Sequence, residues 1–143
     1  MQLDTARFGA LALGASDLLF FPEGLIGFED LHAWSLLREG SLCWLQAVED
    51  PTIALPVVSP FCHVANYRLR LREADCRPLE WESPEYAVVL AVVAQQQGQW
   101  TLNLRAPLLV RPDLRLGRQV IASGEHSLQH VLPRTAGKAR KSA

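Results

Sequence analysis

The histidines and cysteines of this chain are its candidate metal ligands. A tetrahedral zinc site needs several such residues at short, regular spacings, as in a CxxC pair or two histidines on one helix face. His126 and His130 are four residues apart and would share a face if that segment were helical, but no third ligand lies nearby in the sequence. We therefore expect no metal and no cofactor from the seven candidates, which are His32, His63, His126, His130, Cys43, Cys62 and Cys76.

Nucleophilic and acid–base catalysis have equally little support. Cys62 is next to His63, but catalytic pairs meet in space, whereas neighbouring residues of an extended chain point to opposite sides. We expect Cys62 to be a buried or half-buried cysteine in a turn. The pairs Glu29-Asp30 and Glu49-Asp50 stand in polar turns, where solvated carboxylates lack the raised pKa of a general acid. The chain has no GxSxG elbow and no glycine-rich phosphate loop, so we expect a protein that is not an enzyme.

Three arginines alternate with apolar residues in the segment 67–72. This alternation predicts a strand with Tyr67 and two leucines facing inward and the arginines facing outward. The row Arg68, Arg70 and Arg72 could follow RNA phosphates, or it could be the charged edge that keeps a sheet from aggregating. We favour the edge strand and keep a direct RNA-binding β module, using these arginines and the basic C-terminal residues, as the alternative function.

The elements that hold these residues are mostly strands, because patterns of period two separated by turn signals predominate. The run 86–94 contains four β-branched valines and is apolar on both faces, which predicts a central covered strand. Pro56 makes 53–58 an edge strand or a bulged one. We expect short helical turns at 29–32 and 72–75 and a longer helix at 123–131. The remaining predicted strands are a hairpin of 3–8 and 11–13, then 42–48, 100–104, 108–110 and 116–121.

This pattern predicts a mainly β fold, a small single-domain β-barrel-like structure of many short, mostly antiparallel strands. The chain has 143 residues, 49% of them hydrophobic and 20% charged, which is typical of one folded domain. We place that domain at residues 1–133. Residues 134–143 have no large apolar side chain, which predicts a flexible basic tail.

Two further properties concern the location and the partners of the protein. No apolar run is long enough to cross a bilayer and no signal peptide is evident, so we expect a cytoplasmic protein with three free thiols. Residues 1–50 carry a net charge of −6 and residues 105–143 a net charge of +6. These charges either cover an ordinary soluble surface or provide an acidic face for a basic partner. The overall net charge of −1 disfavours a nucleic-acid binder that relies on bulk positive charge.

One segment resembles the signature of a known family. Residues 21–29 read Phe-Pro-Glu-Gly-Leu-Ile-Gly-Phe-Glu, and they resemble the Phe-x-x-Gly-Ile/Leu-Pro-Gly-Phe-Glu pattern of the FliW family, with Ile26 where the family often has proline. Further blocks agree in order at 45–51, 57–61 and 101–110, followed by 117–121. The resemblance covers roughly residues 2–122.

The resemblance implies a β-barrel-like, non-enzymatic regulator that switches between protein partners. Such a factor binds flagellin in the cytoplasm. When flagellin is exported, the freed factor binds the RNA-binding translational regulator CsrA and antagonises it, so that flagellin mRNA is translated. We expect a monomer when the protein is free, because no coiled-coil seam is visible.

The signature residues have a structural interpretation beside the functional one. Gly24 and Gly27 can adopt positive φ and shape a fixed loop, in which Phe21 and Phe28 are buried rings. Exposed carboxylates near this loop could meet basic patches on CsrA and repel RNA. The predicted protein-binding residues are Glu23, Glu29, Glu49, Asp50 and Asn103.

Overall fold

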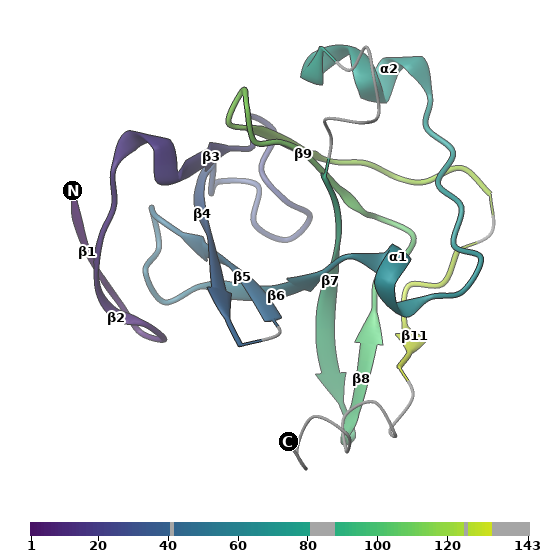
Figure 1. The fold of residues 1–143 in the computed structure, drawn as a ribbon, viewed down its shortest axis with the longest axis horizontal. Coiled ribbons are helices and arrows are strands. Elements are labelled where there is room, and N and C mark those ends of the chain that lie inside the picture. Colours follow the sequence, from purple (N-terminus) through teal and green to yellow (C-terminus); the bar gives the residue numbers. More distant parts are fainter. Residues whose placement is uncertain (41, 81–87, 125, 133–143) are drawn as a thin grey trace.

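The computed structural model describes residues 1–40, 42–80, 88–124 and 126–132. Most of these residues form strands, and the helices are short (Figure 1). The strands are β1 (Gln2–Thr5), β2 (Gly9–Ala12), β3 (Leu18–Phe20), β4 (Ala33–Glu39), β5 (Leu42–Ala47), β6 (Ala54–Val58), β7 (Val88–Gln96), β8 (Gln99–Leu102), β9 (Leu108–Arg111), β10 (Leu116–Gln119) and β11 (His130–Val131). The helices are α1 (Pro60–His63), α2 (Glu73–Cys76) and the 3-10 turns η1 (Ala15–Asp17) and η2 (Arg77–Leu79).

Seven strands close into a barrel in the order β7-β6-β5-β4-β3-β10-β9, and β9 pairs back with β7. Every pairing is antiparallel except the single contact of Leu116 in β10 with Phe20 in β3. Strand β7 pairs with β9 through residues 88–90 and with β8 through residues 93–96, so its second half leaves the barrel as a hairpin (Figure 1). The predicted fold class, a mainly β barrel of short and mostly antiparallel strands, is confirmed.

The barrel interior contains side chains that are fully removed from solvent. Phe21, Trp34 and Leu45 have no exposed surface, and they pack with Val57 and Leu108 in one cluster. The Trp34 indole N–H is also satisfied, because it donates to the carbonyl of Leu31 at 3.1 Å.

A second cluster covers the outer face of β7. It joins Ala91 and Val93 of β7 with Leu102 of β8, under Tyr67. Leu90 of the same strand belongs to the interior cluster. The prediction of a central strand covered on both faces is therefore confirmed for residues 89–93, and residues 86 and 87 of the predicted run lie outside the described residues.

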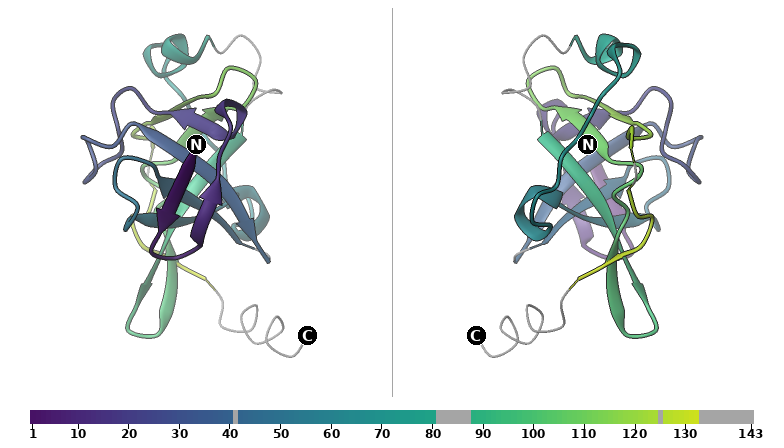
Figure 2. Two further views of the ribbon diagram at one scale, coloured as in Figure 1. Left: turned by 90° about the vertical axis from the view of Figure 1, so that its left-hand side faces the viewer. Right: turned by 90° about the vertical axis from the view of Figure 1, so that its right-hand side faces the viewer.

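The N-terminal hairpin of β1 and β2 lies against one side of the barrel, as the left view of Figure 2 shows. Arg7 at its turn attaches the hairpin to the barrel. Its guanidinium lies 3.6 Å from the centre of the Trp44 ring and forms an ion pair of 3.0 Å with Glu39. The predicted hairpin is confirmed, and its turn falls between Thr5 and Gly9.

The segment 67–72 is not a strand, although its predicted alternation of buried and exposed side chains is correct. Tyr67 and Leu69 pack on the outer cluster, and Leu71 packs on a third cluster around Leu79. This packing buries the apolar side of the segment without a β-ladder to a neighbouring strand. The helical turn predicted at 72–75 is present as α2, shifted by one residue.

Two helical predictions are wrong. The segment 123–131 contains Gly124 at φ +96° and ends in β11, which pairs with β8, so no helix forms in its described residues. The turn at 29–32 is closed by a single bond from the Leu31 N–H to the Phe28 carbonyl and does not continue as a helix.

Pro56 lies within β6, where it faces Trp44 of β5. Strand β7 pairs only with Val57 and Val58 of β6, so Pro56 stands beyond that ladder, where its missing N–H removes no bond. The predicted tail at 134–143 lies outside the described residues. No helix in the described part of the chain is long and apolar enough to cross a membrane.

Candidate protein-binding surface

The signature loop, residues 21–29, connects β3 towards β4 and has a closely bonded backbone. The Gly24 N–H donates to the Phe21 carbonyl at 2.8 Å, and the Phe28 N–H donates to the Leu25 carbonyl at 2.7 Å. Gly24 has φ +69°, and a Cβ there would lie 2.6 Å from the carbonyl oxygen of Glu29. Gly27 has φ +90° with open space around it. Both predicted positive-φ glycines are confirmed. At residue 24 a larger side chain is disfavoured by the positive φ and also has no room for its Cβ.

The two aromatic residues of the loop point inward. Phe21 is fully buried in the barrel cluster. Phe28 is half-buried and meets Trp34 edge to face, with ring centres 6.3 Å apart. The prediction of a buried ring is confirmed for Phe21, whereas Phe28 is only partly buried and packs at the margin of the same cluster.

Gln119 joins the signature loop to two other sequence blocks. Its side-chain oxygen accepts the Ile26 N–H at 2.7 Å, and its side-chain N–H donates to the Ala106 carbonyl at 3.0 Å. Ile26 therefore supplies a hydrogen bond that a proline at this position would lack. The sequence does not predict this role of Gln119, because an amide in a strand gives no signal of its partner.

Three of the predicted carboxylates are hydrogen-bonded close to this loop. Glu29 accepts the Gly27 N–H at 2.9 Å. Glu49 accepts the backbone N–H groups of His32, at 3.0 Å, and of Ala33, at 2.8 Å. Asp50 accepts the hydroxyl of Thr52 at 2.6 Å and its N–H at 3.1 Å, and these bonds hold the pKa of Asp50 below its usual value.

The other two predicted residues also have partners within the fold. Glu23 pairs with Arg118 of β10 at 3.0 Å, and 67% of the Glu23 side chain remains exposed. The side-chain oxygen of Asn103 accepts the N–H groups of Arg105 and Ala106, both at 3.1 Å, and so closes the turn before β9.

The structure thus brings Glu23, Glu29 and Glu49 to the connection between β3 and β4, with Asp50 directly after Glu49. Glu23, Glu29 and Glu49 are exposed, whereas Asp50 and Asn103 are half-buried. Asn103 is on the chain between β8 and β9. It lines a groove of about 290 Å³ between the signature loop and the β7–β8 hairpin, a feature that sequence analysis missed.

The candidate metal and nucleophile residues do not assemble into a site in the structure. Among the described residues, no three side chains of histidine, cysteine, aspartate or glutamate converge in a way that could hold a metal ion. His126 packs against the Tyr67 ring at 5.6 Å. Cys62 is exposed on α1, so the expectation that it is buried or half-buried is wrong; the buried residue of this short helix is Pro60.

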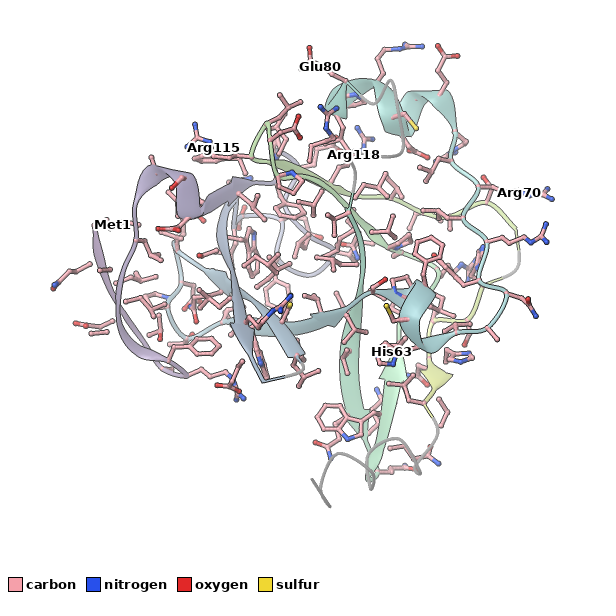
Figure 3. All side chains as sticks on the ribbon, in the orientation of Figure 1. Met1, His63, Arg70, Glu80, Arg115 and Arg118 are labelled. Atoms are coloured by element: carbon pink, nitrogen blue, oxygen red, sulfur yellow. The ribbon has the colours of Figure 1, made fainter. Side chains whose placement is uncertain are left out.

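The arginine row of 67–72 is exposed, and Arg70 points away from the fold (Figure 3). Arg72 forms an ion pair of 3.2 Å with Asp75. Because these residues do not form a strand, the interpretation of the row as a charged edge strand is wrong. The row is the outer side of an irregular segment.

Comparison with known proteins places this chain in a family. The family described as FliW protein matches residues 2–132. The chain belongs to the FliW family. Its barrel is therefore a FliW-family barrel, and the signature loop with its glycines is the feature by which the sequence resembled that family.

Relatives of the chain have the same family name. The flagellar assembly factor FliW of Geotalea uraniireducens (strain Rf4) is 34% identical, in an alignment that covers 96% of this chain and 88% of the relative. The factor of the same name from Moorella thermoacetica is 36% identical and covers 92% and 88%. A crystal structure of the flagellar assembly factor FliW has the same fold, with a TM-score of 0.83, 22% identity, and coverage of 91% and 94%.

Proposed function

We propose that this chain is a cytoplasmic flagellar assembly factor that binds flagellin and the translational regulator CsrA. By binding CsrA it antagonises that regulator, so that flagellin mRNA is translated, and it does so without catalysis. The observation that carries the proposal is the match to the FliW family over residues 2–132, together with relatives that are named flagellar assembly factors.

The signature loop supports a docking role for its carboxylates. Glu29 uses one oxygen to accept the Gly27 N–H, and Glu23 uses one oxygen to pair with Arg118. Within the described residues the second oxygen of each carboxylate has no partner, and both side chains are exposed. CsrA binds RNA and must therefore present positive charge, which such preorganised carboxylates would attract while repelling RNA phosphates.

Charge reversal tests this electrostatic step. Glu23→Lys and Glu29→Lys should weaken CsrA binding, most strongly at low salt, because exposed charges are screened as ionic strength rises. Glu73→Lys is the matched control, since Glu73 lies on α2, outside the signature loop, and is also an exposed glutamate paired with an arginine, at 3.1 Å from Arg77. Isothermal titration calorimetry at two salt concentrations measures the effect. Equal CsrA affinity of all three variants at low salt would refute the electrostatic mechanism.

The alternative, a direct RNA-binding β module, retains one supporting observation, the exposed row of Arg68, Arg70 and Arg72. A filter-binding assay with a flagellin leader transcript separates the two functions. Under our proposal the chain alone retains no transcript. Retention that disappears in a chain with the three arginines changed to glutamine would favour the alternative.

A further inference from the structure

The groove beside the signature loop, which we call the hairpin groove, has a floor made by one face of the β7–β8 hairpin. Ala94 of β7 stands directly opposite Thr101 of β8, and Val92 and Gln96 lie on the same face of β7. Ala94 and Thr101 are small, so the middle of the floor is low. This arrangement leaves an open volume of about 290 Å³, enough for more than one aliphatic side chain of a partner.

The walls of the hairpin groove carry larger apolar side chains. Ile26 and Phe28 of the signature loop form one wall, and Leu128, from the segment before β11, forms another. Ile26 is 62% exposed and Leu128 is 54% exposed. Because the Ile26 N–H is bonded to Gln119 at 2.7 Å, the first wall is fixed to the barrel and does not depend on a partner for its position.

The chemistry of the lining defines what can enter. None of the described lining residues is ionisable, and the polar ones are amides and one hydroxyl, such as Gln96, Gln129 and Thr101. A charged group inserted here would lose its hydration without gaining an opposite charge. The occupant must therefore present an uncharged apolar surface.

Charge also distinguishes between the possible occupants of the hairpin groove. Residues 134–143 of this chain contain four basic residues and no large apolar one, so they do not match the lining. The positively charged surface that CsrA needs for RNA does not match it either. A flagellin subunit does match, because a subunit that will pack against its neighbours in a filament has apolar surface that is uncovered before assembly.

The backbone of the floor determines the form of the occupant. Strand β8 is paired with β7 on one side and with β11 on the other, and the Leu132 N–H continues that ladder to the Trp100 carbonyl at 2.8 Å. On its β8 side the floor therefore offers side chains and no open strand edge. A segment bound over β8 must satisfy its own backbone hydrogen bonds, as a helix does.

We propose that the hairpin groove binds the uncharged apolar face of a helix of unassembled flagellin, while the carboxylates of the signature loop serve CsrA. This inference rests on the proposed function and adds to it the surface for one of the two partners.

A substitution in the floor tests the inference. Ala94→Phe fills the low middle of the groove, and Ala94 is exposed, so the larger ring does not enter the core. Gln95→Phe places the same ring on the opposite face of β7 and is the matched control. Calorimetric titration of the full chain with monomeric flagellin and, separately, with CsrA should show flagellin binding roughly tenfold or more weaker for Ala94→Phe. CsrA affinity should stay within about twofold, and Gln95→Phe should match the unchanged chain for both partners.

A second variant controls for the possibility that Ala94→Phe disturbs folding. Ile26→Asp introduces a charge into the exposed wall and should weaken flagellin binding in the same way, with an unchanged circular dichroism spectrum.

Four outcomes would overturn the inference. Equal flagellin affinity of Ala94→Phe and Gln95→Phe would show that the groove is not used, and the proposed function would stand. A loss of CsrA binding alone would assign the groove to CsrA. A concentration-dependent dimer of this chain that Ala94→Phe abolishes would assign it to a second copy. An unchanged chain that binds neither protein would refute the proposed function as well.

Discussion

Gly117 of β10 is predicted to be a position where one added methyl group disrupts the barrel. A Cβ at residue 117 would lie 2.3 Å from Cζ of Phe21 and 2.5 Å from Cε2. Carbon atoms in contact prefer about 3.5–4.0 Å, so the ring or the strand would have to move by more than about 1 Å.

Neither side can move easily. Phe21 has no exposed surface, and Gly117 is held by its pairing with Val110 of β9, beside the contact of Leu116 with Phe20. Overpacking of this kind costs about 3 kcal/mol, which corresponds to a melting temperature lower by about 10 °C for a domain of this size. Urea unfolding of Gly117→Ala followed by circular dichroism measures the cost.

A control and a rescue identify the cause. Gly14→Ala adds the same methyl group where φ is −93° and the nearest atom is 3.5 Å away, so it should leave stability unchanged or raise it by about 0.5 kcal/mol. Phe21→Leu removes the ring atoms in conflict, so the double variant Phe21→Leu/Gly117→Ala should be more stable than the two single effects predict by at least about 1 kcal/mol. Additive costs, or a Gly117→Ala chain as stable as Gly14→Ala, would refute the argument.

Three further predictions follow from the contacts near the loop and the helices. Glu49→Ala leaves two exposed backbone N–H groups to water in place of their acceptor and should lower the free energy of unfolding by about 0.5–1.5 kcal/mol in urea titrations. Because the folded-state pKa of Asp50 is below its usual value, the stabilisation by its carboxylate is complete above about pH 4 and is lost as the pH falls through that folded pKa. The difference in the free energy of unfolding between Asp50→Asn and the unchanged chain should therefore shrink between pH 7 and pH 3, and a constant difference would contradict this prediction. Iodoacetamide should modify exposed Cys62 before Cys76, because burial, together with the neighbouring acids, raises the pKa of the Cys76 thiol, and mass spectrometry of partial digests reads the order.

Much of the barrel was predictable because local sequence patterns identify several of its strands. The valine-rich run of β7 and the turn after it predicted the hairpin, and residues 97 and 98 indeed turn with φ +51° and +77°. Strands β3 and β4 were missed. In β4 the neighbours Trp34 and Ser35 are both buried, so the period of two that identifies a strand is absent there.

The segment 67–72 shows the converse error. Its alternation is real, yet alternation reports which side is buried and does not report whether a neighbouring strand is present. The apolar side is covered by clusters that include residues of β7, β8 and β9, all distant in sequence. The information that decides between strand and irregular segment is therefore tertiary.

The candidate site was predictable in its loop and unpredictable in its groove. Gly24 and Gly27 have the conformations that their spacing suggested. The hairpin groove needs the signature loop, the β7–β8 hairpin and Leu128 to converge, and no local pattern in the sequence reports that convergence. The carboxylates that the sequence singled out proved to be bonded within the fold, an arrangement that fixes their positions.

The central claim, that this FliW-family chain acts by binding a translational regulator, is tested most directly with three purified proteins and one RNA. A labelled flagellin leader transcript is bound to CsrA, the chain is added, and unpolymerised flagellin is added last, with anisotropy recorded at each step. The account predicts that the chain releases the transcript and that flagellin restores its binding to CsrA. A transcript that stays on CsrA at saturating amounts of the chain would contradict the account.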